Sequence, residues 1–209
     1  SELWTSKKQV TSDTIRSMMK APIEGPGWIW LKNTLRQWIN SGERRYLLWM
    51  GDSAGEVLLD LAMIQILIRR GINVILSVKK AFYYDSVTLF DVLEDPYLQE
   101  MLSGAKIIAN PNISKKELLE ELKSDKTLYV ISDGTQEHFN PLLTSVTFAR
   151  AFKEADAVIS RSAEDADCFI KSRFQFTRDC LSMVCKKPGK LMLRENCVIQ
   201  RSYVFQRQL

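Results

Sequence analysis

Short apolar runs alternate along this chain with longer segments in which apolar residues recur every three or four positions. The runs have the length of buried strands, and the longer segments have the period of amphipathic helices. Strands are predicted at residues 46–50, 72–78, 106–109, 127–131 and 157–159. Helices are predicted at residues 28–39, 56–70, 87–102 with an interruption near Asp95-Pro96, 114–122, 142–155 and 163–176.

The regular alternation of strands and helices predicts the fold class. It is typical of a single α/β domain with a mainly parallel, doubly wound sheet, here of five to six strands flanked by helices. Residues 28–176 are expected to form this core, after a lead-in at 1–27 that contains one short helix near 12–20. A C-terminal extension at 177–209 follows. In it, Lys187-Pro188-Gly189-Lys190 predicts a turn, and residues 198–205 predict an edge strand or hairpin.

Composition narrows the class of protein. Of the 209 residues, 45% are hydrophobic and 26% are charged, which is ordinary for a globular domain. The 29 basic and 25 acidic side chains are evenly spread, so no nucleic-acid partner is expected. No apolar run approaches the roughly 18 residues of a membrane-spanning helix, and Ser1-Glu2-Leu3-Trp4 lacks the form of a signal peptide. We therefore expect a cytoplasmic protein without a membrane partner.

The four cysteines lie late in the chain and show no C-x-x-C spacing. They are Cys168, Cys180, Cys185 and Cys197. With a single histidine, His138, a zinc site is not expected. Reduced thiols are the expected state of these cysteines in a cytoplasmic protein.

Polar side chains follow the predicted strands at the points where the strands end. These residues are Asp52, Ser53, Lys79, Asp85, Ser86, Asn110, Asn112, Ser132, Asp133, Arg161 and Ser162. Parallel strands bring their carboxyl ends to one edge of a sheet, and ligands bind there. Carboxylate, amide and hydroxyl oxygens suit Mg²⁺ or Mn²⁺, and basic side chains suit phosphate. Two simpler interpretations stay open: polar residues gather in loops, and Asp52 and Ser53 cap the following helix.

Several other kinds of site lack their motifs. The turn at residues 51–55 does not have the G-x-G-x-x-G spacing of a dinucleotide fold, and no P-loop is present. The second strand ends in Lys79-Lys80 instead of the acidic residue that binds a ribose. His138 has no G-x-S-x-G motif beside it, which argues against a serine hydrolase.

Three blocks of this sequence together resemble a known family, the metal-dependent damage-control phosphatases. Residues 52–60 read D-S-A-G-E-V-L-L-D, close to the family's D-N-x-G-E-x-x-x-D. Residues 85–91 read D-S-V-T-L-F-D, close to N-D-x-T-x-x-D. Residues 131–134 and 155–162 resemble a third block that ends in A-D-x-V-I-S-K-G. This family was formerly a domain of unknown function, and it includes proteins named acidic-residue methyltransferases. The chain looks like a divergent member.

The resemblance implies roles for particular residues. By position, the metal ligands would be Asp52, Ser53 and the Asp85/Ser86 pair, and Arg161 would contact phosphate. The sequence departs from the family pattern in each of the three blocks. Ser53 replaces an amide, Ser86 falls at the second-motif Asp, and Arg161-Ser162 replaces Lys-Gly. These substitutions affect the inferred activity more than the inferred fold.

The leading functional hypothesis is metal-dependent hydrolysis of a small phosphate ester, such as a sugar phosphate or a phosphorylated metabolite. Asp52 and Asp85 would hold Mg²⁺, Mn²⁺, Co²⁺ or Ni²⁺ with help from Ser53 or Ser86, and Glu56 would orient a ligand. The substrate would be bound by Lys79, Ser132, Asp133 and Arg161. One alternative is a catalytically degenerate binding protein. Another is an S-adenosylmethionine-dependent carboxyl methyltransferase. A homodimer through the C-terminal tail is a further expectation.

Overall fold

The alternation predicted from the sequence is present in the folded chain. The computed structural model describes residues 26–162, 165, 168, 169, 176, 178–187 and 190–193. Its strands are β1 (Tyr46–Met50), β2 (Asn73–Val78), β3 (Lys106–Ile108), β4 (Leu128–Ser132), β5 (Ala157–Ser160), β6 (Asp179–Lys187) and β7 (Lys190–Leu193). Its helices are α3 (Pro26–Ser41), α4 (Ala54–Arg69), α5 (Leu89–Glu94), α6 (Pro96–Met101), α7 (Lys115–Leu122) and α8 (Val146–Glu154).

The strands form one sheet in the order β3-β4-β2-β1-β5-β6-β7. The first six strands pair in parallel, and β7 pairs with β6 in the antiparallel sense. The prediction of a mainly parallel α/β sheet flanked by helices is therefore confirmed. The sixth parallel strand, β6, comes from the region that the sequence assigned to a C-terminal extension. β6 and β7 flank the predicted turn at residues 187–190.

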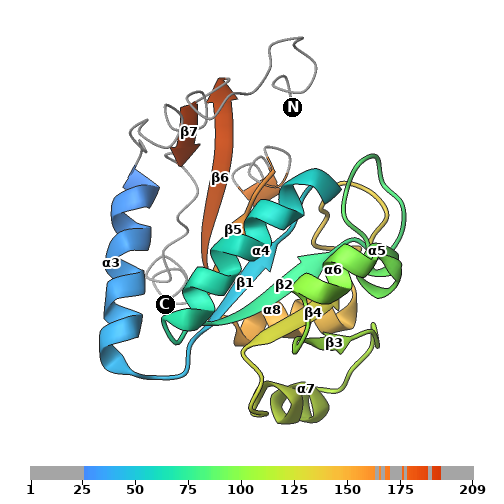
Figure 1. Cartoon of the computed structure of the whole chain (residues 1–209), viewed down its shortest axis with the longest axis horizontal. Helices are drawn as coiled ribbons and strands as arrows, with labels where there is room; N and C mark the ends of the chain where they lie inside the picture. Colours follow the sequence, from blue (N-terminus) through green and yellow to red (C-terminus); the bar gives the residue numbers. More distant parts are fainter. Residues whose placement is uncertain are drawn as a thin grey trace, which may run out of the picture.

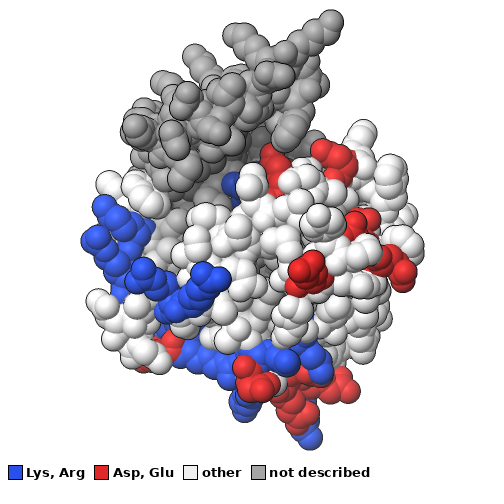
Figure 2. All heavy atoms as spheres, viewed as in Figure 1, with Lys and Arg blue, Asp and Glu red and all other residues white. Residues whose placement is uncertain are grey.

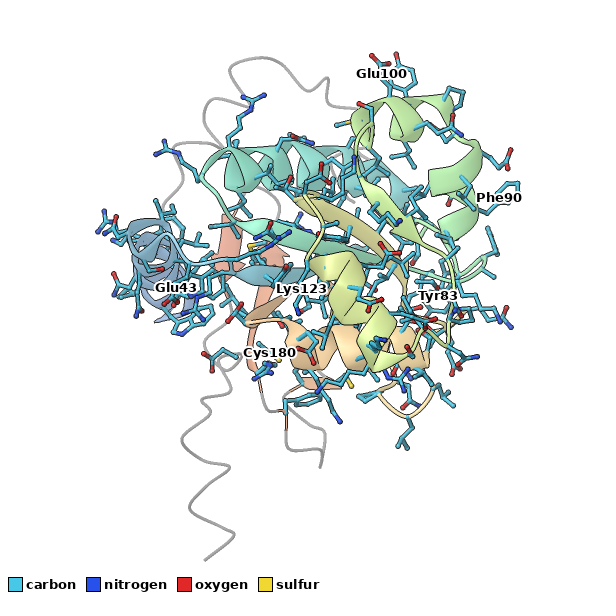
Figure 3. The ribbon with its side chains drawn as sticks, turned by 90° about the horizontal axis from the view of Figure 1, so that it is seen from below. Glu43, Tyr83, Phe90, Glu100, Lys123 and Cys180 are labelled. Carbon is cyan, nitrogen blue, oxygen red and sulfur yellow. The ribbon has the colours of Figure 1, made fainter. Side chains whose placement is uncertain are left out.

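Helices cover both faces of the sheet. Alternate residues of β1 point to opposite faces, with Leu47 and Trp49 in one core cluster and Leu48 and Met50 in the other. The first cluster packs against α3, α4, α5 and α6, and the second packs against α7 and α8. Figure 1 shows α4 in front of the strands and α8 behind them, and Figure 3 shows the same layers from below.

Local caps set where several helices begin. Ser114 forms a reciprocal capping box with Glu117 at the start of α7, as its spacing predicts. The predicted interruption at Asp95-Pro96 is also present. Asp95 ends α5 and caps α6, and Pro96 occupies the first position of α6, where its missing N–H costs nothing.

Some of the predicted elements fall outside the described residues. These are the short helix near 12–20, the strand at 198–205 and most of the helix at 163–176, of which Asp165, Cys168 and Phe169 are described and helical. Among the helices that the structure does describe, none is long and apolar enough to cross a bilayer.

The strand order places a crevice at the carboxyl end of β1. β1 lies between β2 and β5, and the helices that follow β1 and precede β5 cover opposite faces of the sheet. Connections that depart to opposite faces leave an opening beyond the carboxyl ends of the strands, and ligands bind in that opening in open α/β sheets.

Truncation of Leu61 to alanine tests the packing of α4 on the sheet. Leu61 is fully buried in the first core cluster, so Leu61→Ala should lower the free energy of unfolding by about 2–5 kcal/mol. Leu142→Ala, at an exposed leucine, should change it by less than about 0.5 kcal/mol. Urea unfolding followed by circular dichroism measures both. Equal losses in the two variants would contradict this packing.

Candidate functional site

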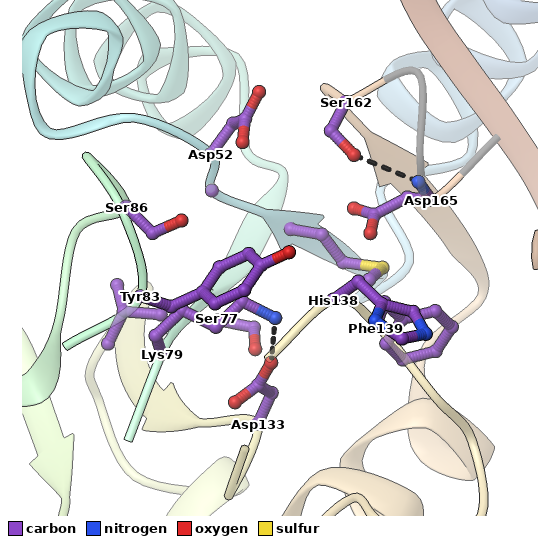
Figure 4. Close-up of a pocket in the computed structure, with 13 residues that line it drawn as sticks. Asp52, Ser77, Lys79, Tyr83, Ser86, Asp133, His138, Phe139, Ser162 and Asp165 are labelled. Atoms are coloured by element: carbon purple, nitrogen blue, oxygen red, sulfur yellow. Dashed lines mark hydrogen bonds and ion pairs between the residues drawn. The ribbon is translucent and has the colours of Figure 1, made fainter. Parts of the chain in front are cut away.

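A small pocket opens at the carboxyl ends of the central strands (Figure 4). Its empty volume is about 380 Å³, including the open mouth. Polar residues from β1, β2, β4 and β5 or the loops after them line it: Asp52, Ser77, Lys79, Ser86, Asp133, Ser162 and Asp165. Five other residues complete the wall: Met50, Val78, Tyr83, His138 and Phe139, with Gly51 at the base. The pocket lies at the sheet edge that the sequence predicts.

The turn from β1 to α4 presents Asp52 to the pocket. Gly51 donates its N–H to the Ser77 carbonyl at 2.9 Å, and a Cβ at residue 51 would stand 3.3 Å from that oxygen. A glycine therefore allows β1 to end close against β2. Ser53 caps α4, since its hydroxyl accepts the Glu56 N–H at 3.2 Å. Of the two proposed helix caps, Ser53 is the one that the structure shows, while Asp52 lines the pocket.

The loop after β2 is fastened to this turn by backbone hydrogen bonds. Val87 donates to the Asp52 carbonyl at 3.0 Å, and Ala54 donates to the Asp85 carbonyl at 2.7 Å. Ser86 lines the pocket, whereas Asp85 is exposed and does not. The Asp85 carbonyl thus accepts a hydrogen bond from the first residue of α4. The structure places Ser86, not Asp85, beside Asp52.

Lys79 and Asp133 form a largely buried ion pair on the pocket wall. The Lys79 Nζ lies 2.8 Å from Asp133 Oδ2 and donates to Thr135 Oγ1 at 3.2 Å. Thr135 in turn donates to both oxygens of Asp133, each at 2.8 Å. The amine also stands 5.7 Å from the centre of the Tyr83 ring. An ammonium has three N–H donors, so the two bonds leave one N–H for a ligand.

The turn after β4 requires a glycine. Gly134 has a φ of +87°, and a Cβ there would stand 2.6 Å from Ser145. The Ser132 hydroxyl accepts the Gly134 N–H at 3.0 Å, and Ser145 donates its N–H to the Asp133 carbonyl at 2.7 Å. Ser132, predicted to contact substrate, is thus part of the turn that holds Asp133 and does not line the pocket.

Asp165 faces Asp52 across the same opening (Figure 4). Only 8% of its surface is exposed, and its backbone N–H donates to the Ser162 hydroxyl at 2.9 Å. Burial raises the pKa of Asp165 to about 7; the charge of Lys79 opposes this shift and the charge of Asp52 adds to it. The sequence did not predict Asp165 as a site residue. Its position three residues after Ser162, beyond the end of β5, was the available indication.

An aromatic wall completes the pocket and was also not predicted. Tyr83, His138 and Phe139 line it, each from a loop that follows a strand. Tyr84 has a φ of +47°, and Ser86 closes the turn by donating its N–H to the Tyr83 carbonyl at 3.0 Å. The periodicity of apolar residues does not predict which loop residues line a pocket, because the direction of their side chains depends on turn geometry.

Arg161 is not among the residues that line the pocket. Its Nε lies 2.8 Å from Asp60 Oδ1, and its guanidinium lies 3.6 Å from Glu56 Oε2. Asp60 is only 2% exposed, so its charge needs a partner inside the protein. Burial raises the pKa of Asp60, and the Arg161 charge opposes that shift. In the structure Arg161 therefore pairs with two acidic residues of α4, and neither Arg161 nor Glu56 is among the residues that line the pocket.

The donor chemistry of the pocket fits a weakly held divalent cation. Asp52 and Ser86 offer hard oxygen ligands from adjacent loops, and both face the opening. Within the described part of the chain, no group of three histidine, cysteine or acidic side chains is placed to hold a metal. Mg²⁺ is commonly bound by one or two carboxylates with waters and ligand phosphates in its remaining positions, and that arrangement matches this donor set.

Comparison with known proteins supports the fold. No protein-family model matches the chain, and no curated protein matches it. Among solved structures, a DUF89 family protein from Pyrococcus horikoshii is similar, with a TM-score of 0.50 and 18% sequence identity. The chain has a DUF89-like fold. The match covers 77% of this chain and 51% of the other, so this chain spans about half the length of that protein.

Removal of the Arg161 charge tests its structural role. Arg161→Met would leave Asp60 buried without its partner and should lower the free energy of unfolding by about 3 kcal/mol. The double variant Asp60→Leu with Arg161→Met should recover most of that loss, because no unpaired charge remains. Urea unfolding measures all three proteins. No loss in the single variant would contradict the ion pair.

Protonation of Asp165 should make stability depend on pH. The folded-state pKa of about 7 exceeds the ordinary value near 4, so the folded protein binds more protons in that interval. Stability should therefore fall as pH rises from about 4 to about 7, by at most roughly 4 kcal/mol. Asp165→Asn should remove this slope. Thermal unfolding at several pH values, in a chelating buffer, measures it.

The exposed Asp85 supplies the control for this experiment. Asp85→Asn should keep the slope of the parent protein. Identical pH profiles for the parent and Asp165→Asn would contradict the raised pKa.

Proposed function

We propose that this pocket binds a divalent cation together with a small phosphate ester, and that the protein is a metal-dependent phosphomonoester hydrolase. The observation that carries the proposal is the joint placement of Asp52, Ser86 and Lys79 around one opening. Oxygen donors for a cation and an amine for phosphate thus face the same small volume. The DUF89-like fold is compatible with the family resemblance of the sequence motifs. The proposed reaction and substrate class rest on the pocket.

Each residue would have a distinct task. Asp52 and Ser86 would hold the cation, and the third N–H of Lys79 would bind a phosphoryl oxygen. Asp133 and Thr135 position the Lys79 amine by the hydrogen bonds described above. The cation would supply charge neutralisation at the phosphoryl group and a more acidic bound water. Tyr83 and Phe139 would contact the apolar part of the ester.

Asp165 would handle the proton. A carboxyl group whose pKa lies near the working pH can both give and accept a proton. Asp165 and Asp52 both line the opening, so the Asp165 carboxyl would lie on the other side of a bound ester from Asp52. It would take a proton from the attacking water or give one to the leaving oxygen. In its protonated form it also adds no negative charge against a phosphate.

A second function, binding without turnover, is favoured by a specific observation. Two of the polar groups that the family resemblance assigns to catalysis are occupied elsewhere: the Ser53 hydroxyl caps α4, and Arg161 pairs with Asp60. The protein would then be a degenerate member that retains a phosphate or cation site. Carboxyl methylation has no comparable support, since no residue of the pocket points to that cofactor.

Replacement of Asp52 tests the cation site. Mn²⁺ or Mg²⁺ should raise the melting temperature of the parent protein by mass action, and Asp52→Ala should lose this shift. Hydrolysis of a panel of sugar phosphates should fall at least about 100-fold in the same variant. Glu100→Ala, which removes an exposed acid on α6, serves as control and should keep both properties.

The outcomes separate the two functions. A metal shift with hydrolysis, both lost in Asp52→Ala, supports the phosphatase. A metal shift without any hydrolysis supports binding alone. A shift that survives in Asp52→Ala would contradict the site assignment.

A further inference from the structure

Helix α4 is apolar on its outer side as well as on its inner side. Its inner residues Val57, Leu61 and Ile64 are buried against the sheet. Its outer side carries an exposed row, here called the α4 stripe, made of Leu58, Leu59, Ala62, Met63 and Ile66. A helix that is hydrophobic all round is typical of a fully buried position. The α4 stripe is therefore an exposed surface on a helix whose composition is typical of a buried one.

The stripe is continuous and uncharged. Successive turns of the helix contribute Leu58 with Leu59, Ala62 with Met63, and Ile66, so the stripe runs along one side of the helix. Leu59 is 68% exposed, Met63 is 51% exposed and Ile66 is 53% exposed. Figure 2 shows a broad uncharged area over α4, with Lys and Arg side chains at one edge of it. Contiguous exposed apolar surface of this kind marks protein interaction sites.

The charges at the two ends of α4 are complementary when two copies of the helix pack antiparallel. Glu56 lies in the first turn, Arg69 lies in the last turn, and Arg70 follows as the cap. Ala62 occupies the middle of the stripe, where a small side chain permits two helices to approach closely. Two antiparallel copies of α4 that cross at Ala62 would place Glu56 of one copy near Arg69 and Arg70 of the other. A parallel pair would instead bring the arginines together, which is unfavourable.

We propose that a second copy of this chain covers the α4 stripe, with the two α4 helices antiparallel around a twofold axis at Ala62. A twofold interface uses the same patch on both subunits, so the patch must complement itself. The stripe meets this requirement in both polarity and charge: apolar rows would meet apolar rows, and each acidic end would meet a basic end. The proposal is independent of the chemistry of the pocket, and it differs from a dimer through the C-terminal tail.

Sedimentation equilibrium of the full chain tests the dimer. The parent protein should sediment as a dimer, and Met63→Lys should weaken association by roughly 100-fold or more, because each interface would bury two unpaired charges. Leu142→Lys is the matched control: it also places a lysine at an exposed apolar residue, but in the segment between β4 and α8 and not in α4. Because Leu142 is not part of the α4 stripe, this variant should leave the dimer unchanged. Circular dichroism should show that all three proteins are folded.

A crosslinking experiment tests the geometry. Ala62→Cys should form a covalent dimer with a short bis-maleimide, because the two copies of residue 62 face each other at the axis. Leu142→Cys should not, and the parent protein controls for the native cysteines. A parent protein that is monomeric at every concentration would overturn the proposal. A dimer that persists in Met63→Lys, or no crosslinking through Ala62→Cys, would overturn it as well.

Discussion

β1 pairs in parallel with both of its neighbours, and this pairing positions the pocket and the helices around it. Because β2 and β5 run in the same direction as β1, their carboxyl ends meet at one edge. The backbone then completes the arrangement. The loop after β2 is hydrogen bonded to the turn after β1, so residues more than thirty positions apart face one small pocket. The site is therefore a consequence of strand order and main-chain bonding, and its side chains are positioned by both.

Two buried ion pairs, each between a basic side chain and an aspartate, have different roles in the structure. Lys79 and Asp133 lie on the pocket wall, where Thr135 holds both of them in place. Asp60 belongs to α4 and pairs with Arg161, which directly follows β5, and neither residue lines the pocket. Burial of a charge demands a partner in either place. Of the two pairs, only Lys79 and Asp133 line the pocket, so only this pair is a candidate for phosphate binding.

Helix α4 connects the pocket to the outer surface. Its N-terminus begins with the Ser53 cap next to Asp52, and its inner side packs on the sheet. Its outer side is equally apolar, which a solitary domain does not require. A partner on that side would bury the helix that carries the first motif of the pocket. Catalytic and assembly features would then share a single secondary-structure element.

The class of fold could be predicted from the sequence, because strand and helix periods and capping residues such as Ser114 act locally. The sequence also located Asp52, Lys79 and Asp133, since residues after parallel strands share an edge. Tertiary structure alone decided which neighbour turns inward: Ser86 faces the pocket because the Asp85 carbonyl is bonded to α4. It also decided that Arg161 pairs with Asp60, since burial of that carboxylate depends on packing that no local pattern records.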